Sequence, residues 1–528
     1  MLQPRTHRPH VSWRVSRPHV DSAAIRGVLA FVWRDRRIGA GVAFGVAAGA
    51  AAILSLLMPR GPITATEALT TMAAGLLVGV TGGLTMRSRW AMLVAPLAFV
   101  AVYELVRLGT DGPTVDGIHF SMYGLIALVV GRGVHGVLVL LPILGGAALG
   151  AGLARRIEGP RHRRGWARAG LYVRRGVAAL VGVGLVVLAV MIARPATTDP
   201  ILGPDGEPLA GSIAELTRVE IGGHDLAMMI RGNSSDSPVL LFLAGGPGGS
   251  ELGAMRRHLE ALEQDFLVVT WDQRGTGKSY SEIDPTSTLT LDRAVSDTVE
   301  VTNYLRDRFG KDKVYLVGQS WGSILGVLAV QQHPELYRAF VGTGQMVSPR
   351  ETDRIFYRDT LAWARQTGNS DLVATLTDIG PPPYETILPY ESALSYEHDV
   401  YPYDHSRNSE GEGGFSENLF VEEYTLLEQV HNLGAMMDTF SVLYPQLQQI
   451  DFRVDATELD VPVYLVQGRH EAGGRAKLAD EWFAQLRAPS KQLIALDTSG
   501  HRPLFEQPQQ FREVMTETVL AETSTDRP

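Results

Sequence analysis

The stretch Gly318-Gln319-Ser320-Trp321-Gly322 decides the fold of this chain, because it falls between a short apolar strand and an apolar helix. Residues 314–317 before it form an apolar run typical of a buried strand, and residues 324–330 after it continue as an apolar helix. The two glycines of a G-x-S-x-G turn let the backbone pass close on both sides of a strained serine. Ser320 is therefore the candidate nucleophile.

Charge divides the chain into two parts of different composition. Residues 1–195 hold 22 Arg and no Lys against 7 Asp and Glu, a net charge of +15, and they are rich in Gly, Ala, Val and Leu. The whole chain of 528 residues carries −9, so the remainder carries −24 and has the mixed composition of a globular enzyme. This acidic part has no basic patch with interleaved aromatic residues, so we expect no nucleic-acid binding. The chain has no Cys, which excludes disulfides, thiolate catalysis and Cys-ligated zinc.

The N-terminal part is predicted to be a membrane domain at residues 38–193. A bilayer core about 30 Å thick needs about 20 apolar residues in a helix. Five runs approach or exceed that length: 38–58, 68–86, 90–106, 133–154 and 173–192. A shorter stretch, 119–130, is predicted to be interfacial or re-entrant, with a sixth spanning helix as the alternative. Gly41, Gly45 and Gly49 repeat at four-residue spacing, and we expect this small-residue face to allow close helix packing, with dimerisation as the alternative.

The arginines predict the orientation of these spans, because cytoplasmic loops carry an excess of Arg and Lys. They gather before the first span, after the second and after the fourth: Arg26, Arg34, Arg36, Arg37, Arg87, Arg89, Arg155, Arg156, Arg161, Arg163, Arg164, Arg168, Arg174 and Arg175. Five spans with a basic cytoplasmic segment at 1–37 place the linker at 194–214, and everything after it, outside the cytoplasm. We expect this domain to serve mainly as an anchor in the lipid bilayer of the cell membrane.

The second part of the chain alternates strands with helices, which predicts an α/β fold with a mostly parallel sheet covered on both faces. Strands are expected at 217–221, 226–230, 239–242, 266–271, 314–317, 339–342, 463–466 and 492–495, and helices at 291–309 and 323–332. Such a sheet binds ligands at the carboxyl ends of its strands, which is where Ser320 lies.

A glycine-rich loop follows the strand at 239–242, with the sequence Ala244-Gly245-Gly246-Pro247-Gly248-Gly249-Ser250. Backbone N–H groups in such a loop can face the negative oxygen that develops when a serine attacks a carbonyl group. We assign the N–H groups of Gly246 and of Trp321, the residue after the nucleophile, to this oxyanion hole. The alternative is an ordinary tight turn.

The proton acceptor for Ser320 is expected near the chain end, because the order Ser, acid, His is typical of this architecture. His501 lies on a loop just after the last predicted strand. The acid candidate is Glu471, which follows the strand before it, and its carboxylate would hold the imidazole tautomer and stabilise the imidazolium. Asp497 is the alternative acid, but we expect it to be too close in sequence to His501 to bridge to its ring.

The sequence predicts neither a cofactor nor a metal site. Residues 275–279 resemble the end of a phosphate-binding P-loop, but position 272 is Asp where that motif needs Gly. His470-Glu471 begins like a zinc-protease motif, but the second His would fall at Gly474.

These motifs together resemble the α/β-hydrolase superfamily, and within it the proline iminopeptidase group of serine peptidases. The resemblance covers roughly residues 215–515 and is carried by four segments: 245–248 (GGPG, similar to the group's HGGPG loop), 272–279 (DQRGTGKS, similar to DQRG-x-G-x-S), 318–323 (GQSWGS, similar to GGSWGS) and 468–471 (GRHE, similar to GR-x-D). Two positions depart from the group: Ala244 stands where the loop has His, and Glu471 stands where the acid is usually Asp.

The resemblance implies a hydrolase core at 215–346 and 456–520, with a helical cap inserted at 347–455. It also implies that cap carboxylates hold the N-terminal ammonium group of a peptide substrate, which makes Glu422 and Glu423 candidates, with a solvated helix face as the alternative. We therefore expect a membrane-anchored serine hydrolase that releases N-terminal residues, such as proline, from short peptides. The alternatives are an esterase or lipase acting on envelope acyl groups, and a membrane sensor whose hydrolase-like domain only binds a ligand.

Overall fold

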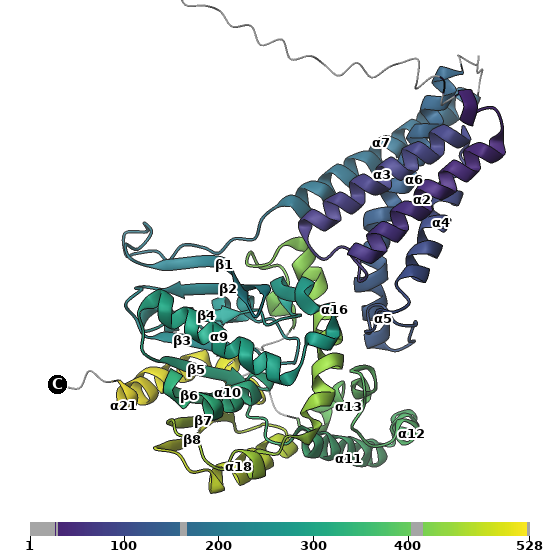
Figure 1. Cartoon of the computed structure of the whole chain (residues 1–528). Helices are drawn as coiled ribbons and strands as arrows, with labels where there is room; N and C mark the ends of the chain where they lie inside the picture. Colours follow the sequence, from purple (N-terminus) through teal and green to yellow (C-terminus); the bar gives the residue numbers. More distant parts are fainter. Residues whose placement is uncertain (1–26, 28–29, 159–165, 403–414, 525–528) are drawn as a thin grey trace, which may run out of the picture.

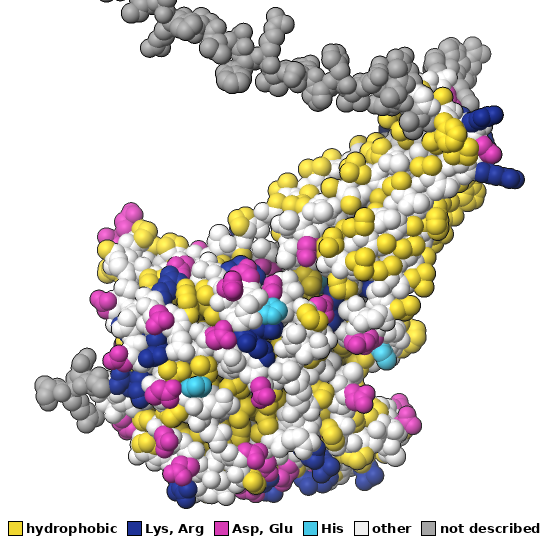
Figure 2. Space-filling model, viewed as in Figure 1, with side chains coloured by type: hydrophobic (Ala, Val, Ile, Leu, Met, Phe, Trp, Pro, Cys, Tyr) yellow, Lys and Arg dark blue, Asp and Glu magenta, His cyan; other side chains and the backbone are white. Residues whose placement is uncertain are grey.

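The computed structural model describes residues 27, 30–158, 166–402 and 415–524, which form a bundle of apolar helices and an α/β domain (Figure 1). The bundle contains α2 (Arg36–Leu57), α3 (Ala65–Met86), α4 (Ala91–Val106), α6 (Val134–Ile157) and α7 (Trp166–Ala193). Apolar side chains cover much of the visible face of this bundle, and Arg side chains project from its far end (Figure 2). Most of the predicted cytoplasmic segment 1–37 lies outside the described residues.

Within the described residues, four helices are long and apolar enough to cross a bilayer. They are Arg36–Leu57, Ala65–Met86, Met122–Ile157 and Arg175–Ala193. The fifth predicted span, α4, is apolar but has only 16 residues. The chain thus has the helices of a membrane protein, whereas the number of crossings and their orientation stay predictions.

Most of the stretch 119–130 is the N-terminal part of a longer helix, which corrects the predicted re-entrant segment and the predicted sixth span, while the interfacial position stays a prediction. α5 (Met122–Leu128) runs through a π-helical turn (Val129–Gly133) into α6, giving one helix of 36 residues. At 1.5 Å per residue this helix is about 54 Å long, well beyond a bilayer core of about 30 Å. Its N-terminal part, α5, instead contacts α16 (Leu426–Leu443) of the α/β domain (Figure 1).

Close packing in the bundle uses glycines other than the predicted ones. On α2 the predicted set faces outward, and a Cβ added to any of its members would have no described atom within 4 Å: Gly41, Gly45 and Gly49. The contact between α3 and α6 is close: a Cβ on Gly79 would lie 2.1 Å from the carbonyl O of Ile143, and one on Gly150 would lie 2.1 Å from that of Val80. The packing prediction for α2 is therefore wrong, and small residues on α3 and α6 allow the backbones to touch instead.

The α/β domain is built on an eight-stranded sheet in the order β1-β2-β4-β3-β5-β6-β7-β8. The strands are β1 (Ile213–Ile221), β2 (His224–Gly232), β3 (Val239–Leu243), β4 (Leu267–Trp271), β5 (Val314–Gln319), β6 (Tyr337–Thr343), β7 (Val463–Gly468) and β8 (Lys491–Leu496). β2 pairs antiparallel with β1 and β4, and the other neighbours pair in parallel. The predicted α/β fold with a mostly parallel sheet is confirmed.

The central strands are buried on both faces, and every residue of β3, β4, β5 and β7 is buried. This burial explains why these strands read as continuous apolar runs in the sequence. One face packs against α9 (Leu291–Phe309) and α10 (Trp321–Gln332), and the other packs against α8 (Leu252–His258) and the C-terminal helical segment from Pro508.

Between β6 and β7 the described chain is largely helical. Its helices are α11 (Pro349–Thr367), α12 (Ser370–Ile379), α13 (Glu391–Leu394), α14 (Glu397–Val400), α16 (Leu426–Leu443) and α17 (Phe452–Asp455). We refer to this insertion as the cap. The cap helix α16 stands between the sheet and the membrane helices (Figure 1).

Candidate active site

Ser320 lies at the turn between β5 and α10, with φ of 53° and ψ of −116°. A positive φ is strained for a residue with a side chain, and such strain concentrates at functional sites. The turn needs both of its glycines: a Cβ on Gly318 would lie 2.4 Å from the carbonyl O of Gly322, and one on Gly322 would lie 2.0 Å from that of Leu243. The turn therefore holds Ser320, partly buried, at the carboxyl edge of the sheet.

The structure brings Ser320, His501 and Glu471 into one hydrogen-bonded chain. The Nε2 atom of His501 lies 3.0 Å from the Oγ of Ser320, and its Nδ1 atom lies 2.6 Å from the Oε2 of Glu471. The alternative acid, Asp497, is largely exposed, and its Oδ1 lies 2.8 Å from the Nη2 of Arg469. The geometry thus places Glu471, and not Asp497, beside the imidazole.

Glu471 is buried among partners that keep it ionised. Its Oε1 accepts hydrogen bonds from the Nε of Arg475 at 2.7 Å and from the N–H of Ala472 at 2.8 Å, which leaves Oε2 for His501. Burial alone would raise the pKa of Glu471, but Arg475 and His501 together lower this pKa to about 2. The sequence did not single out Arg475. Its spacing of four residues from the acid, at the start of α18 (Gly473–Gln485), is the signal that points to it.

The ring of His501 is held from the same edge of the sheet. Gly344, just after β6, has φ of 51°, and a Cβ there would lie 2.4 Å from the carbonyl O of His501 and 2.9 Å from its Nδ1. The Nε2 of Gln319, the last residue of β5, donates to the same carbonyl at 3.3 Å. The ends of β5 and β6 thereby fix both Ser320 and the backbone of His501.

The glycine-rich loop after β3 begins against Ser320. A Cβ on Gly245 would lie 3.4 Å from the Cβ of Ser320. The N–H of Gly245 donates to the Oε2 of Glu251 at 3.3 Å, whereas the hydrogen bonds of the described residues include no acceptor for the N–H of Gly246. The N–H of Trp321 is the first of α10 and has no partner within that helix. These two N–H groups are thus available as oxyanion donors.

Gln273 ties the glycine-rich loop to the residue after the nucleophile. Its Nε2 donates to the carbonyl O of Ala244 at 3.3 Å, and its Oε1 accepts a hydrogen bond from the indole Nε1 of Trp321 at 2.8 Å. This contact uses the backbone carbonyl of Ala244. It therefore does not depend on the His side chain that the similar HGGPG loop has at this position. The sequence contained this residue in the DQRG segment but did not reveal its role.

Glu422 and Glu423 are not brought to the triad in the structure. The Oε1 of Glu422 lies 3.5 Å from the Nη2 of Arg194, and the Oε1 of the buried Glu423 accepts a hydrogen bond from the Oγ1 of Thr198 at 3.4 Å. Both partners belong to the segment that joins α7 to β1. The N–H of Thr197 also donates to the carbonyl O of Glu422, so this part of the cap runs along the linker.

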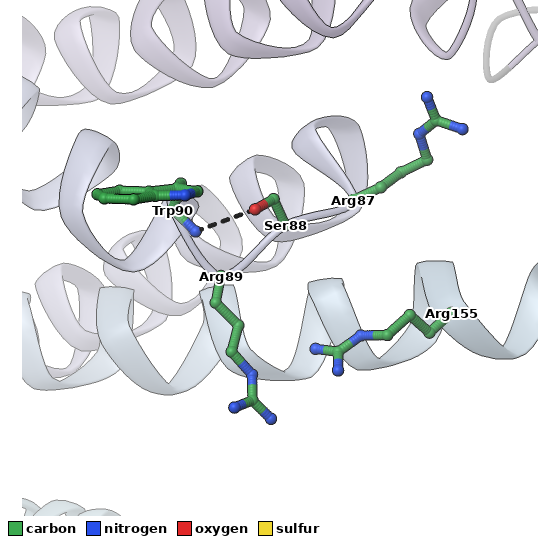
Figure 3. A pocket seen from close by; sticks show the side chains of 5 residues that line it. All are labelled: Arg87, Ser88, Arg89, Trp90 and Arg155. Atoms are coloured by element: carbon green, nitrogen blue, oxygen red, sulfur yellow. Dashed lines mark hydrogen bonds between the residues drawn. The ribbon is translucent and has the colours of Figure 1, made fainter. Parts of the chain in front are cut away.

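A hollow of about 440 Å³ opens on the bundle of apolar helices, and the triad does not line it. It is lined by Arg87, Ser88, Arg89, Trp90 and Arg155 (Figure 3). The side chain of Arg87 points away from the other two arginines (Figure 3), and its Nη1 pairs with the Oε1 of Glu158 at 3.2 Å. This arginine-rich surface contains no pairing of a nucleophile with a base, so we do not assign the hydrolytic chemistry to it.

Comparison with known proteins gives the family of this chain. Residues 238–508, just over half of the chain, match the sequence model of the alpha/beta hydrolase fold family. The chain is 29% identical over 312 residues to the probable aminopeptidase YbaC of Bacillus subtilis (strain 168), covering 58% of this chain and 97% of that protein. It is 32% identical over 140 residues to a probable proline iminopeptidase of Leptolyngbya boryana, covering 26% of this chain and 41% of that protein.

Among solved structures, a proline iminopeptidase-related protein from Thermus thermophilus is similar, with 21% identity and a TM-score of 0.41, over 59% of this chain and 98% of that one. The family match covers the elbow of Ser320, the glycine-rich loop, Glu471 and His501, all of which lie within residues 238–508. The chain therefore belongs to the alpha/beta hydrolase fold family.

Proposed function

We propose that the protein is a membrane-anchored serine hydrolase of the aminopeptidase type. The observation that carries the proposal is the hydrogen-bonded chain from the Oγ of Ser320 through His501 to Glu471. In this arrangement an imidazole accepts the proton of a serine hydroxyl, while a carboxylate orients the ring and stabilises its charged form. The ionised state of Glu471, maintained by Arg475, suits that second role.

In the proposed reaction, the Oγ of Ser320 attacks the carbonyl carbon of the substrate, and the Nε2 of His501 accepts the hydroxyl proton. The N–H groups of Gly246 and Trp321 donate to the negative oxygen of the tetrahedral intermediate. The imidazolium of His501 then gives its proton to the leaving amine, and an acyl group remains on Ser320. Water, deprotonated by the same imidazole, attacks this ester, releases the acid and restores the serine.

The proposed substrates are short peptides with a free N-terminus, from which one residue such as proline is released. The motif resemblance to proline iminopeptidases and the names of the similar proteins, an aminopeptidase and a proline iminopeptidase, support this class. Glu422 and Glu423 are not part of the proposal, because their carboxylates contact the linker. The fold and the triad also serve esters, so the test must compare the two chemistries.

The proposal is tested by assaying the full chain in detergent against paired substrates. We expect hydrolysis of coumarin amides of proline and other amino acids, and no hydrolysis of the same amides with an acetylated N-terminus, because an aminopeptidase must recognise the free amine. Acyl esters of nitrophenol form the second panel. Turnover of esters alone would favour the esterase alternative. No turnover together with no labelling of Ser320 by a fluorophosphonate probe would favour a ligand-binding sensor.

We also propose that the α/β domain lies outside the cytoplasm. Ala68, near the N-terminal end of α3, packs in the apolar cluster that includes Leu427 of the cap helix, whereas Arg87 follows the other end of α3. The side of the bundle that carries Arg87 and Arg155 is therefore opposite the α/β domain, as the distribution of arginines predicts for a cytoplasmic end.

Reporter fusions test this orientation directly. Alkaline phosphatase fused after Gly211 is expected to be active, and a fluorescent protein that folds only in the cytoplasm is expected to be dark at the same junction. The control is the pair of fusions after Ser88, where the arginine pattern predicts the reverse result. A bright fluorescent protein after Gly211 would mean an even number of crossings and a cytoplasmic α/β domain.

A further inference from the structure

The cap helix α16 carries contacts to the active-site loops on one side. The backbone of Met436 packs against Gly248, where a Cβ would lie 2.7 Å from the Cα of Met436. The Oγ1 of Thr439 donates to the carbonyl O of Gly275 at 2.6 Å. Gly248 belongs to the loop that supplies the proposed oxyanion donor, and Gly275 belongs to the segment that contains Gln273. A displacement of α16 would therefore reach both loops that shape the site.

Another side of the same helix faces the membrane domain. The residues spaced three or four apart along this side are Leu427, His431, Gly434 and Asp438. Leu427 packs in a cluster with apolar residues of α3, α6 and α7. The Nε2 of His431 lies 3.1 Å from the carbonyl O of Pro62, and a Cβ on Gly434 would lie 3.1 Å from the Cγ2 of Val130. The membrane domain thus contacts α16 along most of the length of that helix.

The carboxylate of Asp438 is the centre of this interface, and its side chain is fully buried. It accepts hydrogen bonds from the Nη1 of Arg60 at 2.6 Å, from the N–H and Oγ1 of Thr114 at 3.0 and 2.6 Å, and from the hydroxyl of Tyr280 at 2.6 Å. Arg60 and Thr114 come from two loops of the membrane domain, and Tyr280 comes from the α/β domain. One buried carboxylate therefore joins the bundle, the cap and the sheet domain.

Arg60 makes further contacts that fix it between the two domains. Its Nε donates to the Oδ2 of Asp284 at 2.9 Å, and its Nη2 donates to the carbonyl O of Asp111 at 2.7 Å.

A second cap helix, α13, also contacts the membrane domain. The carboxylate of its Glu391 accepts hydrogen bonds from the first two N–H groups of α5 at 2.9 and 2.8 Å. The membrane domain thus holds the cap at two places.

We propose that the membrane domain holds α16 in its working position over the active site, with Arg60 and Asp438 as positioning residues for hydrolysis. This inference rests on the proposed function, because it concerns the loops around Ser320. The bundle is then a structural part of the hydrolase and not only an anchor. Removing one partner of a buried ion pair leaves the charge of the other partner uncompensated in a region of low dielectric. A single substitution of Arg60 or Asp438 should therefore be enough to disturb the position of α16.

The test uses the full chain with Arg60→Gln, which removes the charge that faces Asp438. We expect kcat and the rate of fluorophosphonate labelling at Ser320 to fall about 10-fold to 100-fold, because a small misplacement of catalytic groups costs that much. The matched control is Arg107→Gln. In the described part of the chain, the side-chain hydrogen bonds of Arg107 go to Glu104 and Pro59, both in the membrane domain, so the rates of this variant should stay within about twofold of the wild type.

A reversible cross-link separates positioning from a general loss of stability. The chain has no Cys, so Val130→Cys with Gly434→Cys introduces one defined pair across the interface. A Cβ at position 434 would lie 3.1 Å from the Cγ2 of Val130, so the distance between the two Cβ atoms differs from that value by at most one carbon–carbon bond, and a disulfide joins Cβ atoms about 3.5–4.5 Å apart. In the Arg60→Gln background, oxidation should restore most of the lost rate, and a reductant should remove it again.

Two outcomes would overturn the inference. Wild-type rates in Arg60→Gln would overturn it, and so would a loss that the disulfide does not restore. If Arg60→Gln does not accumulate, Thr114→Val removes one donor to Asp438 and keeps the charge, and a smaller loss with the same rescue is expected. A wild-type protein that is never labelled at Ser320 would instead contradict the proposed function itself.

Discussion

Replacing Ser320 with Ala is expected to lower kcat on the order of 10⁴-fold or more on any substrate that the wild type hydrolyses. The substitution removes the attacking oxygen, and only the oxyanion donors and substrate binding remain to assist water. The measurement is the steady-state rate of the full chain in detergent on the best substrate of the amide and ester panels. A residual rate close to that of the wild type would mean that another group is the nucleophile.

The matched control for this substitution is Ser296→Ala on α9. The hydroxyl of Ser296 lies 3.4 Å from the Oε1 of Glu300 in the same helix, so its loss should leave kcat unchanged. Thermal unfolding of the two variants should be similar to that of the wild type, because neither serine makes a large buried contact. A rate defect confined to Ser320→Ala then reports the chemistry and not the fold.

The second large effect is expected from Glu471→Gln, with a fall in kcat of roughly 10³-fold to 10⁴-fold. The amide is nearly the same size as the carboxylate, but it carries no charge to stabilise the imidazolium of His501 and does not select the same tautomer. Asp497→Asn is the comparison, and its rate should stay within about twofold of the wild type, since the Asp497 side chain is exposed and pairs with Arg469. A severe defect in Asp497→Asn beside a nearly normal Glu471→Gln would move the acid to position 497.

The fold could be predicted because its signals are local. The strand, the tight turn and the helix around Ser320 are contiguous in sequence, and the buried parallel strands appear as continuous apolar runs. His501 and Glu471 could be proposed for a related reason, since each follows a predicted strand in a fixed chain order. The sequence favoured Glu471 over Asp497 as the acid. Only the folded chain gives the distance of each carboxylate from the imidazole of His501.

What the sequence did not reveal depends on contacts between distant segments. The stretch 119–130 contains Gly and Tyr and is short of a full span, but from Met122 onward it forms the outer turns of one long helix, which the cap contacts there. Resemblance alone pointed to Glu422 and Glu423 as substrate-binding residues, and the linker from α7 contacts both of them instead.

The role of the membrane domain is where the structure departs most from what the sequence predicted. Its composition indicates an anchor, and no local pattern connects Arg60 with Asp438, which are 378 positions apart in the chain. Only the folded chain shows that this arginine, in a loop with little other positive charge, pairs with a buried carboxylate of the cap. In the sequence, Arg60 stands in the loop after the first span, which is predicted to lie outside the cytoplasm. There it is only an exception to the rule that arginines gather in cytoplasmic segments.

The central claim is that Ser320 is an activated nucleophile, and fluorophosphonate labelling followed by peptide mass spectrometry tests it most directly. The probe reacts only with a serine whose proton is removed by a neighbouring base, so substrate identity does not matter. The account predicts one adduct, on the peptide that contains Ser320, which is absent in Ser320→Ala and strongly slowed in His501→Ala. An unlabelled wild type, or an adduct on another serine that persists in Ser320→Ala, would contradict it.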